Sequence, residues 1–138
     1  MMQYPSTDSY ANGMVGNFLS ALLHGGKSLG YRSFTFNDAA AKAFSDIADP
    51  DGGGPLAAGI PSGAVYAICV IEADATQADQ ARVARFRCDN TAPTAAEGMP
   101  LGDNGSFEVK GDNLNTFKII GITAGKTHTV RVEFYGAG

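Results

Sequence analysis

The sequence has no tryptophan and is poor in cysteine, histidine and charge. Its 138 residues include 2 Cys and 2 His, and 17% are charged, against roughly 25% in typical soluble domains. Neither cysteine belongs to a Cys-x-x-Cys pair, and His24 and His128 lie far apart with no ligand-like spacing around them. Closed zinc sites need such clusters, so we expect no metal and no other cofactor.

Positive charge is scattered along the chain rather than clustered. The 10 Lys and Arg are outnumbered by 14 Asp and Glu, which gives a net charge of −4. Neutralising phosphates requires clustered cations, so we expect no nucleic-acid partner. No apolar run approaches the roughly 20 residues that span a bilayer, and no signal peptide is evident. We therefore expect no membrane partner, and synthesis in a cytoplasm.

The usual signatures of catalysis are also missing. There is no G-x-S-x-G, no Walker loop and no H-E-x-x-H. His128 lies in an alternating segment, which favours a structural side chain. The acidic stretch Asp46, Asp49 and Asp51 fails as an EF-hand loop, because the twelfth position counted from Asp49 is Ile60 rather than glutamate. We expect no catalytic residues and a protein that is not an enzyme.

Residues 1–30 combine few charges with many small residues and one apolar stripe. The stripe has the i, i+3, i+4, i+7, i+8 spacing of one helical face, and the pair Gly25-Gly26 ends it. Because so short a helix is marginal alone, its stripe must dock, either on its own domain or on a neighbouring subunit. We predict an N-terminal arm, residues 1–30, with a short amphipathic helix. The stripe is formed by Val15, Phe18, Leu19, Leu22 and Leu23.

From residue 31 the pattern changes to short apolar or alternating runs separated by Gly, Asp and Asn turns. There is no strand–helix–strand rhythm, so a parallel sheet is not expected. The sequence predicts an all-β fold, an antiparallel β-sandwich or jelly-roll-like domain of residues 31–138, with residues 39–59 left open. The expected strands are Tyr31–Phe36, Ala64–Glu72, Arg82–Cys88, Ser106–Lys110, Thr116–Ile122 and Thr127–Tyr135.

The two cysteines lie on neighbouring predicted strands. If residues 74–80 close a hairpin, Cys69 faces Cys88 and Ile71 faces Phe86 across it. A disulfide is possible in that register, but a cytoplasmic origin favours two free thiols.

The segment Arg85–Leu101 reads RFRCDNTAPTAAEGMPL. It resembles a pattern in small virion-associated proteins of tailed phages, roughly V-R-W-R-D-D-G-T-x-P-T-x-x-x-G-M-P-L. The similarity extends over about residues 60–136 and includes the final Phe134-Tyr135-Gly136. Three positions depart from the pattern, where Phe86, Cys88 and Asn90 replace Trp, Asp and Gly.

Within this motif, most residue types are those that turns require. Asp89 and Thr91 can bond nearby backbone, and Gly98 is expected at positive φ before Met99 and Leu101 return to the core. Arg85 and Arg87 would share a strand face away from Phe86, where they can pair with acidic groups. The alternative is that the loop recognises a partner.

The resemblance implies a head decoration (cement) protein that binds and stabilises the exterior of a phage capsid. Its partners would be the major capsid protein and further copies of itself, as a trimer or dimer, and its location would be the virion head. The candidate contact residues are the arm stripe together with Arg85 and Arg87. The alternative is a receptor- or glycan-binding module of a phage tail or fibre, which the absence of Trp disfavours because sugar sites usually present exposed aromatic platforms.

Overall fold

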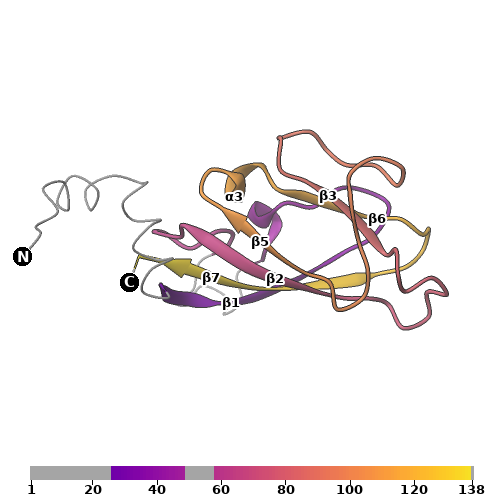
Figure 1. Ribbon diagram of the computed structural model, residues 1–138, viewed down its shortest axis with the longest axis horizontal. Helices are drawn as coiled ribbons and strands as arrows, with labels where there is room; N and C mark the ends of the chain where they lie inside the picture. The colour runs from indigo at the N-terminus through magenta and orange to yellow at the C-terminus, as the bar shows by residue number, and fades with distance from the viewer. Residues whose placement is uncertain (1–25, 49–57, 138) are drawn as a thin grey trace, which may run out of the picture.

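The computed structural model describes residues 26–48 and 58–137, which are mostly β (Figure 1). The strands form two antiparallel sheets, one of four strands in the order β1-β7-β2-β5 and one of three in the order β4-β3-β6. The apolar stripe of residues 15–23 lies outside the described residues. The antiparallel β class expected from the turn-separated runs is confirmed.

The four-stranded sheet is built around β7 (His128–Gly136), which pairs with both β1 (Lys27–Phe36) and β2 (Tyr66–Glu72). The fourth strand, β5 (Ser106–Lys110), pairs with β2. Side chains along β7 alternate between buried and more exposed, because successive residues of a strand point to opposite faces. One face of this sheet is therefore covered and the other faces solvent.

The three-stranded sheet is smaller and centres on β3 (Ala84–Arg87), between β4 (Met99–Leu101) and β6 (Lys118–Gly121). A short helix, α3 (Asn113–Thr116), precedes β6. An isolated bridge between Lys42 and Ile119 continues the sheet beyond β6. This bridge brings the chain that follows β1 onto the second sheet.

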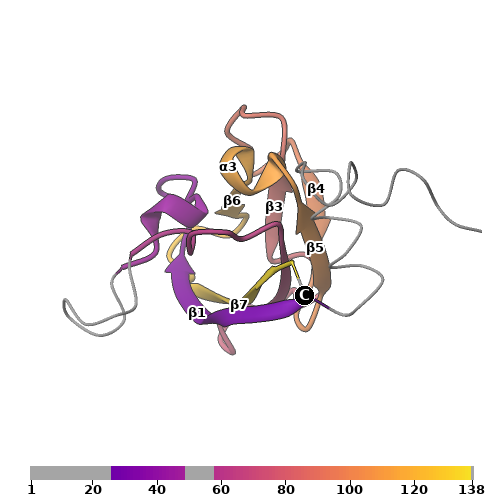
Figure 2. The ribbon, with the colours of Figure 1, turned by 90° about the vertical axis from the view of Figure 1, so that its left-hand side faces the viewer.

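The core lies between the two sheets and is rich in phenylalanine. Phe44 stacks on Phe117 at 4.5 Å between ring centroids and meets Phe134 and Phe34 edge-on. Phe44 belongs to a single 3-10 turn, η1 (Phe44–Asp46), where the Ala43 N–H donates to Asp46 Oδ2 at 2.7 Å. Figure 2 shows this turn above the end of β1. The structure of residues 39–47, which the sequence left open, thus includes a single 3-10 turn that places the ring of Phe44 in the core.

The predicted boundary between arm and domain needs correction. β1 begins at Lys27, so residues 27–30, which the sequence placed in the arm, are part of the sheet. Lys27 pairs with Gly136, and Leu29 packs against the core. The register shifts between Ser28 and Gly30, which interrupts the two-residue alternation and hides the start of the strand.

The predicted hairpin of β2 and β3 is wrong, because the two strands belong to different sheets. Cys69 lies opposite Phe107 and Val132 rather than Cys88. The polar connection after β2 crosses from one sheet to the other, which the turn residues alone do not reveal. Both cysteines are free thiols, and burial raises the pKa of Cys69 to about 12, with a smaller contribution from nearby Cys88.

Candidate functional site

The motif loop, residues 88–98, joins β3 to β4 and is braced from beneath by an arginine. Arg85 Nε donates to the carbonyl oxygen of Ala95 at 3.0 Å, and its Nη1 donates to that of Gly98 at 3.0 Å. The two bonds span the second half of the loop. Arg85 therefore fixes the shape of the loop rather than presenting a free charge.

Close packing at Gly98 restricts the loop further. Gly98 has φ +140°, and a Cβ there would lie 3.0 Å from Arg85 Cβ and 3.1 Å from the Phe86 carbonyl oxygen. The positive φ expected at this glycine is confirmed. Pro93 is buried beneath the loop, and Thr94 and Glu97 exchange two backbone hydrogen bonds. The loop therefore lies at the surface, but contacts and hydrogen bonds among its own residues fix its conformation.

The start of the loop is fixed by an ion pair. Arg87 and Asp89 form a bidentate salt bridge, and Asp89 Oδ1 also accepts the Thr91 N–H at 3.2 Å. The hydrogen bond from Arg87 lowers the pKa of Asp89 to about 2. Thr116, at the end of α3, donates its hydroxyl to the Cys88 carbonyl oxygen. Asp89 thus acts as the turn residue expected from sequence, and Thr91 contributes its backbone N–H to that turn.

The end of the loop presents an apolar side chain to solvent. Met99 is 61% exposed, which contradicts its predicted return to the core, whereas Leu101 does pack against the core. Together with Arg87, Asp89 and Glu97, Met99 lines a shallow depression of about 450 Å³. Of the two candidate arginines, Arg87 lines this depression, whereas Arg85 lies below the loop.

A second surface is the solvent face of the four-stranded sheet. Tyr31 is 50% exposed, and its hydroxyl accepts a hydrogen bond from Arg131 Nη1 at 2.6 Å. Arg131 also forms a bidentate pair with Glu72, at 2.8 Å and 2.9 Å. Ile68, on the same face, is 39% exposed. Aromatic, apolar and charged groups thus lie side by side across β1, β7 and β2.

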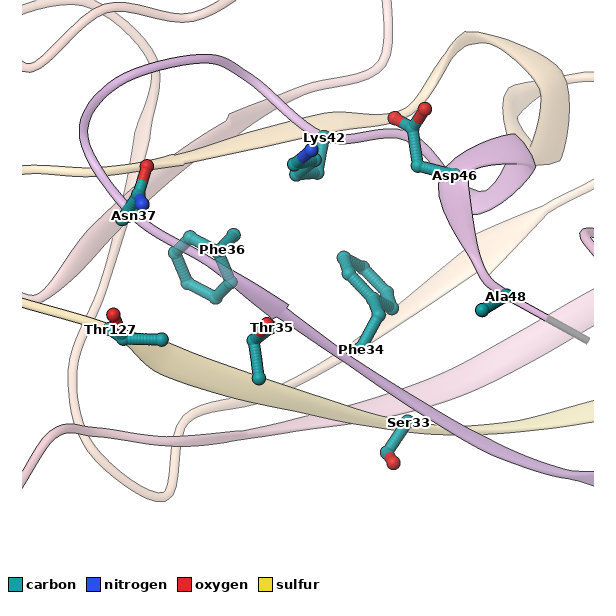
Figure 3. Close-up of a pocket in the computed structure, with 9 residues that line it drawn as sticks. All are labelled: Ser33, Phe34, Thr35, Phe36, Asn37, Lys42, Asp46, Ala48 and Thr127. Carbon is teal, nitrogen blue, oxygen red and sulfur yellow. The ribbon is translucent and has the colours of Figure 1, made fainter. Parts of the chain in front are cut away.

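A third surface is a groove along β1, with a volume of about 540 Å³ (Figure 3). One wall is residues 33–37, and the other is formed by Lys42, Asp46 and Ala48, with Thr127 at one end. Figure 3 shows the ring of Phe34 extending from β1 toward the opposite wall, with the ring of Phe36 beside the strand. The groove therefore lies between β1, the outermost strand of its sheet, and the chain that follows it.

His128 has the geometry of a structural side chain. It is fully buried, packs on Phe36, and its Nδ1 accepts the Asp74 N–H at 3.0 Å. Desolvation lowers its pKa, which keeps the ring neutral and able to accept. The Asp74 carboxylate in turn accepts from Thr76 and Thr127, and these bonds lower its pKa to about 2.

Residues 26–48 and 58–137 contain no group of three or more His, Cys, Asp or Glu placed to hold a metal ion. Within the same ranges, no helix has the length and apolar character needed to cross a membrane.

Of the predicted contact residues, only the two arginines can be located. Val15, Phe18, Leu19, Leu22 and Leu23 lie outside the described residues. Sequence reasoning missed Tyr31, Met99 and Arg32 as surface or edge features. Tyr31 and Arg32 belong to an alternating, aromatic-rich segment. That pattern predicted a strand, but it does not indicate which edge of the strand is unpaired.

No protein-family model, curated protein or solved structure matches this chain.

Proposed function

We propose that this chain is a structural virion protein of a tailed phage, of the head decoration or cement type. It would bind assembled coat protein on the capsid exterior, with further copies of itself as a trimer or dimer. The proposal starts from the resemblance of residues 85–101 to the virion-protein motif. It includes the finer fold expected from sequence, a jelly-roll-like β-sandwich carrying an N-terminal arm with a short helix.

The observation that carries the proposal is the internal bracing of the motif loop. A loop whose shape is fixed before binding loses little entropy on contact, so it can form a repeated and specific interface. Arg85, Gly98 and Pro93 fix that shape, and Met99 is the apolar side chain it presents. Exposed apolar groups within a polar rim are typical of protein–protein contacts.

Immunogold labelling of virions with antibody against the full chain tests the location directly. Labelling over the head is expected, and labelling confined to the tail tip would overturn the decoration assignment. Binding of the purified chain to emptied heads gives a second readout. Met99→Asp should weaken that binding by about tenfold, because it places a charge in an apolar contact.

The control for that experiment is Ile68→Asp, which changes an exposed apolar residue on the other sheet. It should leave head binding unchanged if the motif loop makes the contact. Equal binding by the wild type and Met99→Asp would remove the loop from the interface.

A second candidate is the receptor- or glycan-binding module, and the sheet face around Tyr31 favours it. A half-exposed aromatic ring beside Arg131 and Glu72 offers both stacking and hydrogen bonding to a sugar. Binding of the chain to host surface polysaccharide, lost in Tyr31→Ala and retained in Met99→Asp, would support this function over the first.

A further inference from the structure

The free edge of β1 has backbone groups that no other described segment pairs. Within residues 26–48 and 58–137, β1 is the outermost strand of its sheet and pairs only with β7. The Tyr135 carbonyl oxygen accepts a hydrogen bond from the Val65 N–H, so the backbone groups of Tyr135 point toward β2. The backbone groups of Phe134, and of every second residue before it in β7, therefore point toward β1. Alternation then directs the N–H and C=O groups of Tyr31, Ser33 and Thr35 away from β7.

A buried arginine lies at the same edge. Arg32 is only 3% exposed and is on the inward face of β1, in line with Phe34 and Phe36. Its Nη1 donates a hydrogen bond of 2.9 Å to the Tyr31 carbonyl oxygen, which points away from β7 at the free edge of the strand. Gly30 makes room for this arrangement, since a Cβ there would lie 2.8 Å from Arg32 Nη1.

Arg32 lacks an anionic partner within residues 26–48 and 58–137. The three salt bridges formed there do not include it, and its Nε is buried without a hydrogen-bond acceptor. A buried charge without a counter-charge is costly, and an incoming carboxylate would remove that cost. Inward-pointing charges are also a known means of protecting a sheet edge from unspecific pairing.

We propose that the β1 edge binds an extended segment of a partner protein as an added strand, with an acidic side chain of that segment pairing with Arg32. Main-chain hydrogen bonds to Ser33 and Thr35 would supply affinity, and the carboxylate would supply specificity. The groove beside β1 would take the next inward side chain, over Phe34.

Charge complementarity distinguishes this occupant from two others. Pairing of β1 with β1 of a second copy would bury two Arg32 side chains along one ladder, and like charges there are destabilising. Residues 1–25 hold a single acidic residue, Asp8. Of these three occupants, an acidic segment of another protein fits the edge best.

The test uses the full chain and two short synthetic peptides of alternating Thr and Val, one with a single inward Glu and one with Gln in its place. Amide hydrogen exchange and peptide titration are followed by NMR. The Glu peptide should slow exchange at Ser33 and Thr35 and bind at least about tenfold more tightly than the Gln peptide, since charged hydrogen bonds exceed neutral ones.

Arg32→Gln should abolish this preference, and Arg131→Gln should retain it, because Arg131 lies on the opposite face of the sheet. Equal binding of the two peptides to the wild type overturns the proposal even if Arg32→Gln does not fold. So does unchanged exchange at Ser33 and Thr35 at millimolar peptide. Self-association that masks the same amides would assign the edge to a second copy instead. No capsid is used, so the result is independent of the decoration assignment.

Discussion

The motif loop and the free edge of β1 both depend on arginine, but the arginines differ in whether their hydrogen bonds are made within the chain. In the loop, Arg85 and Arg87 bond to carbonyl and carboxylate groups within the chain. At the edge, Arg32 is more deeply buried, yet a single carbonyl oxygen is its hydrogen-bond acceptor within residues 26–48 and 58–137. An arginine whose bonds are made internally fixes shape, whereas one left without an anion favours a partner that brings one.

The comparison predicts that the loop depends most on its glycine. Gly98→Ala should lower the free energy of unfolding by about 3 kcal/mol, because it combines a strained positive φ with contact against backbone. Chemical denaturation measures this loss. Gly63→Ala is the matched control, since Gly63 has φ +85° but no atom of the described residues lies within 4 Å of an added Cβ. A loss as large in the control would mean that φ alone accounts for the effect.

Arg85→Ala should cost about 2 kcal/mol, because two charge-assisted hydrogen bonds to the loop are lost together. Exchange of the loop amides should rise in the same variant, as NMR can measure. Arg87→Ala, which removes an exposed ion pair, should have a smaller effect that salt diminishes. If Arg87→Ala is the more damaging of the two, the loop is held from its rim rather than from beneath.

At the edge, the sign of the effect should reverse. Arg32→Met should raise the stability of the isolated chain by about 1 kcal/mol, because an apolar group of similar length replaces a buried charge that has no anionic partner among the described residues. The same variant should associate more readily, which sedimentation detects, since the edge loses its inward charge. If the Arg32→Met variant is less stable and remains monomeric, Arg32 has the same role as Arg85, which is to stabilise the fold.

The buried His128 extends the comparison to pH, with the smallest expected effect. Its lowered pKa means that the unfolded chain binds a proton more readily than the folded one. The contribution of His128 to the stability of the fold is therefore complete at pH values above its ordinary pKa of 6.5, and it is lost as the pH falls below 6.5. Denaturation at a series of pH values measures the slope, and His128→Asn should flatten it.

Asp74 and Asp89 provide the reference for that measurement. Both have pKa values lowered from 3.8 to about 2, so their contributions persist above 3.8 and disappear only as pH falls below it. A loss of stability confined to that acid range in the wild type would show that His128 carries no pH dependence.

The sequence predicted the parts of the fold that depend on local pattern. A nearly continuous apolar run located β2, alternation located most of β7, and the residue types of turns anticipated Asp89 and Gly98. The pairing of strands was not predictable in the same way. The connection after Glu72 could equally close a hairpin or cross between sheets, and only the packing of both sheets decides between them.

The candidate site was predicted in part for the same reason. Arg85 and Arg87 were placed correctly on one strand, but the partners of Arg85 are carbonyl oxygens that sequence pattern does not report. Met99 was expected in the core because it is apolar, yet β4 lies at the edge of its sheet, where one side of the strand meets solvent. Arg32 reads as the polar member of an alternating strand, although its side chain faces inward.

The pairing of the first strand with the last sets the order in which the chain can fold during synthesis. Lys27 lies opposite Gly136 and Phe36 opposite His128, so β1 has no partner until the ribosome has made nearly the whole of the sequence shown. Ladders between such distant segments form slowly, because the intervening chain must be ordered first. β1 can therefore join the sheet only after β7 has been synthesised, so its free edge exists as part of a sheet only late in synthesis.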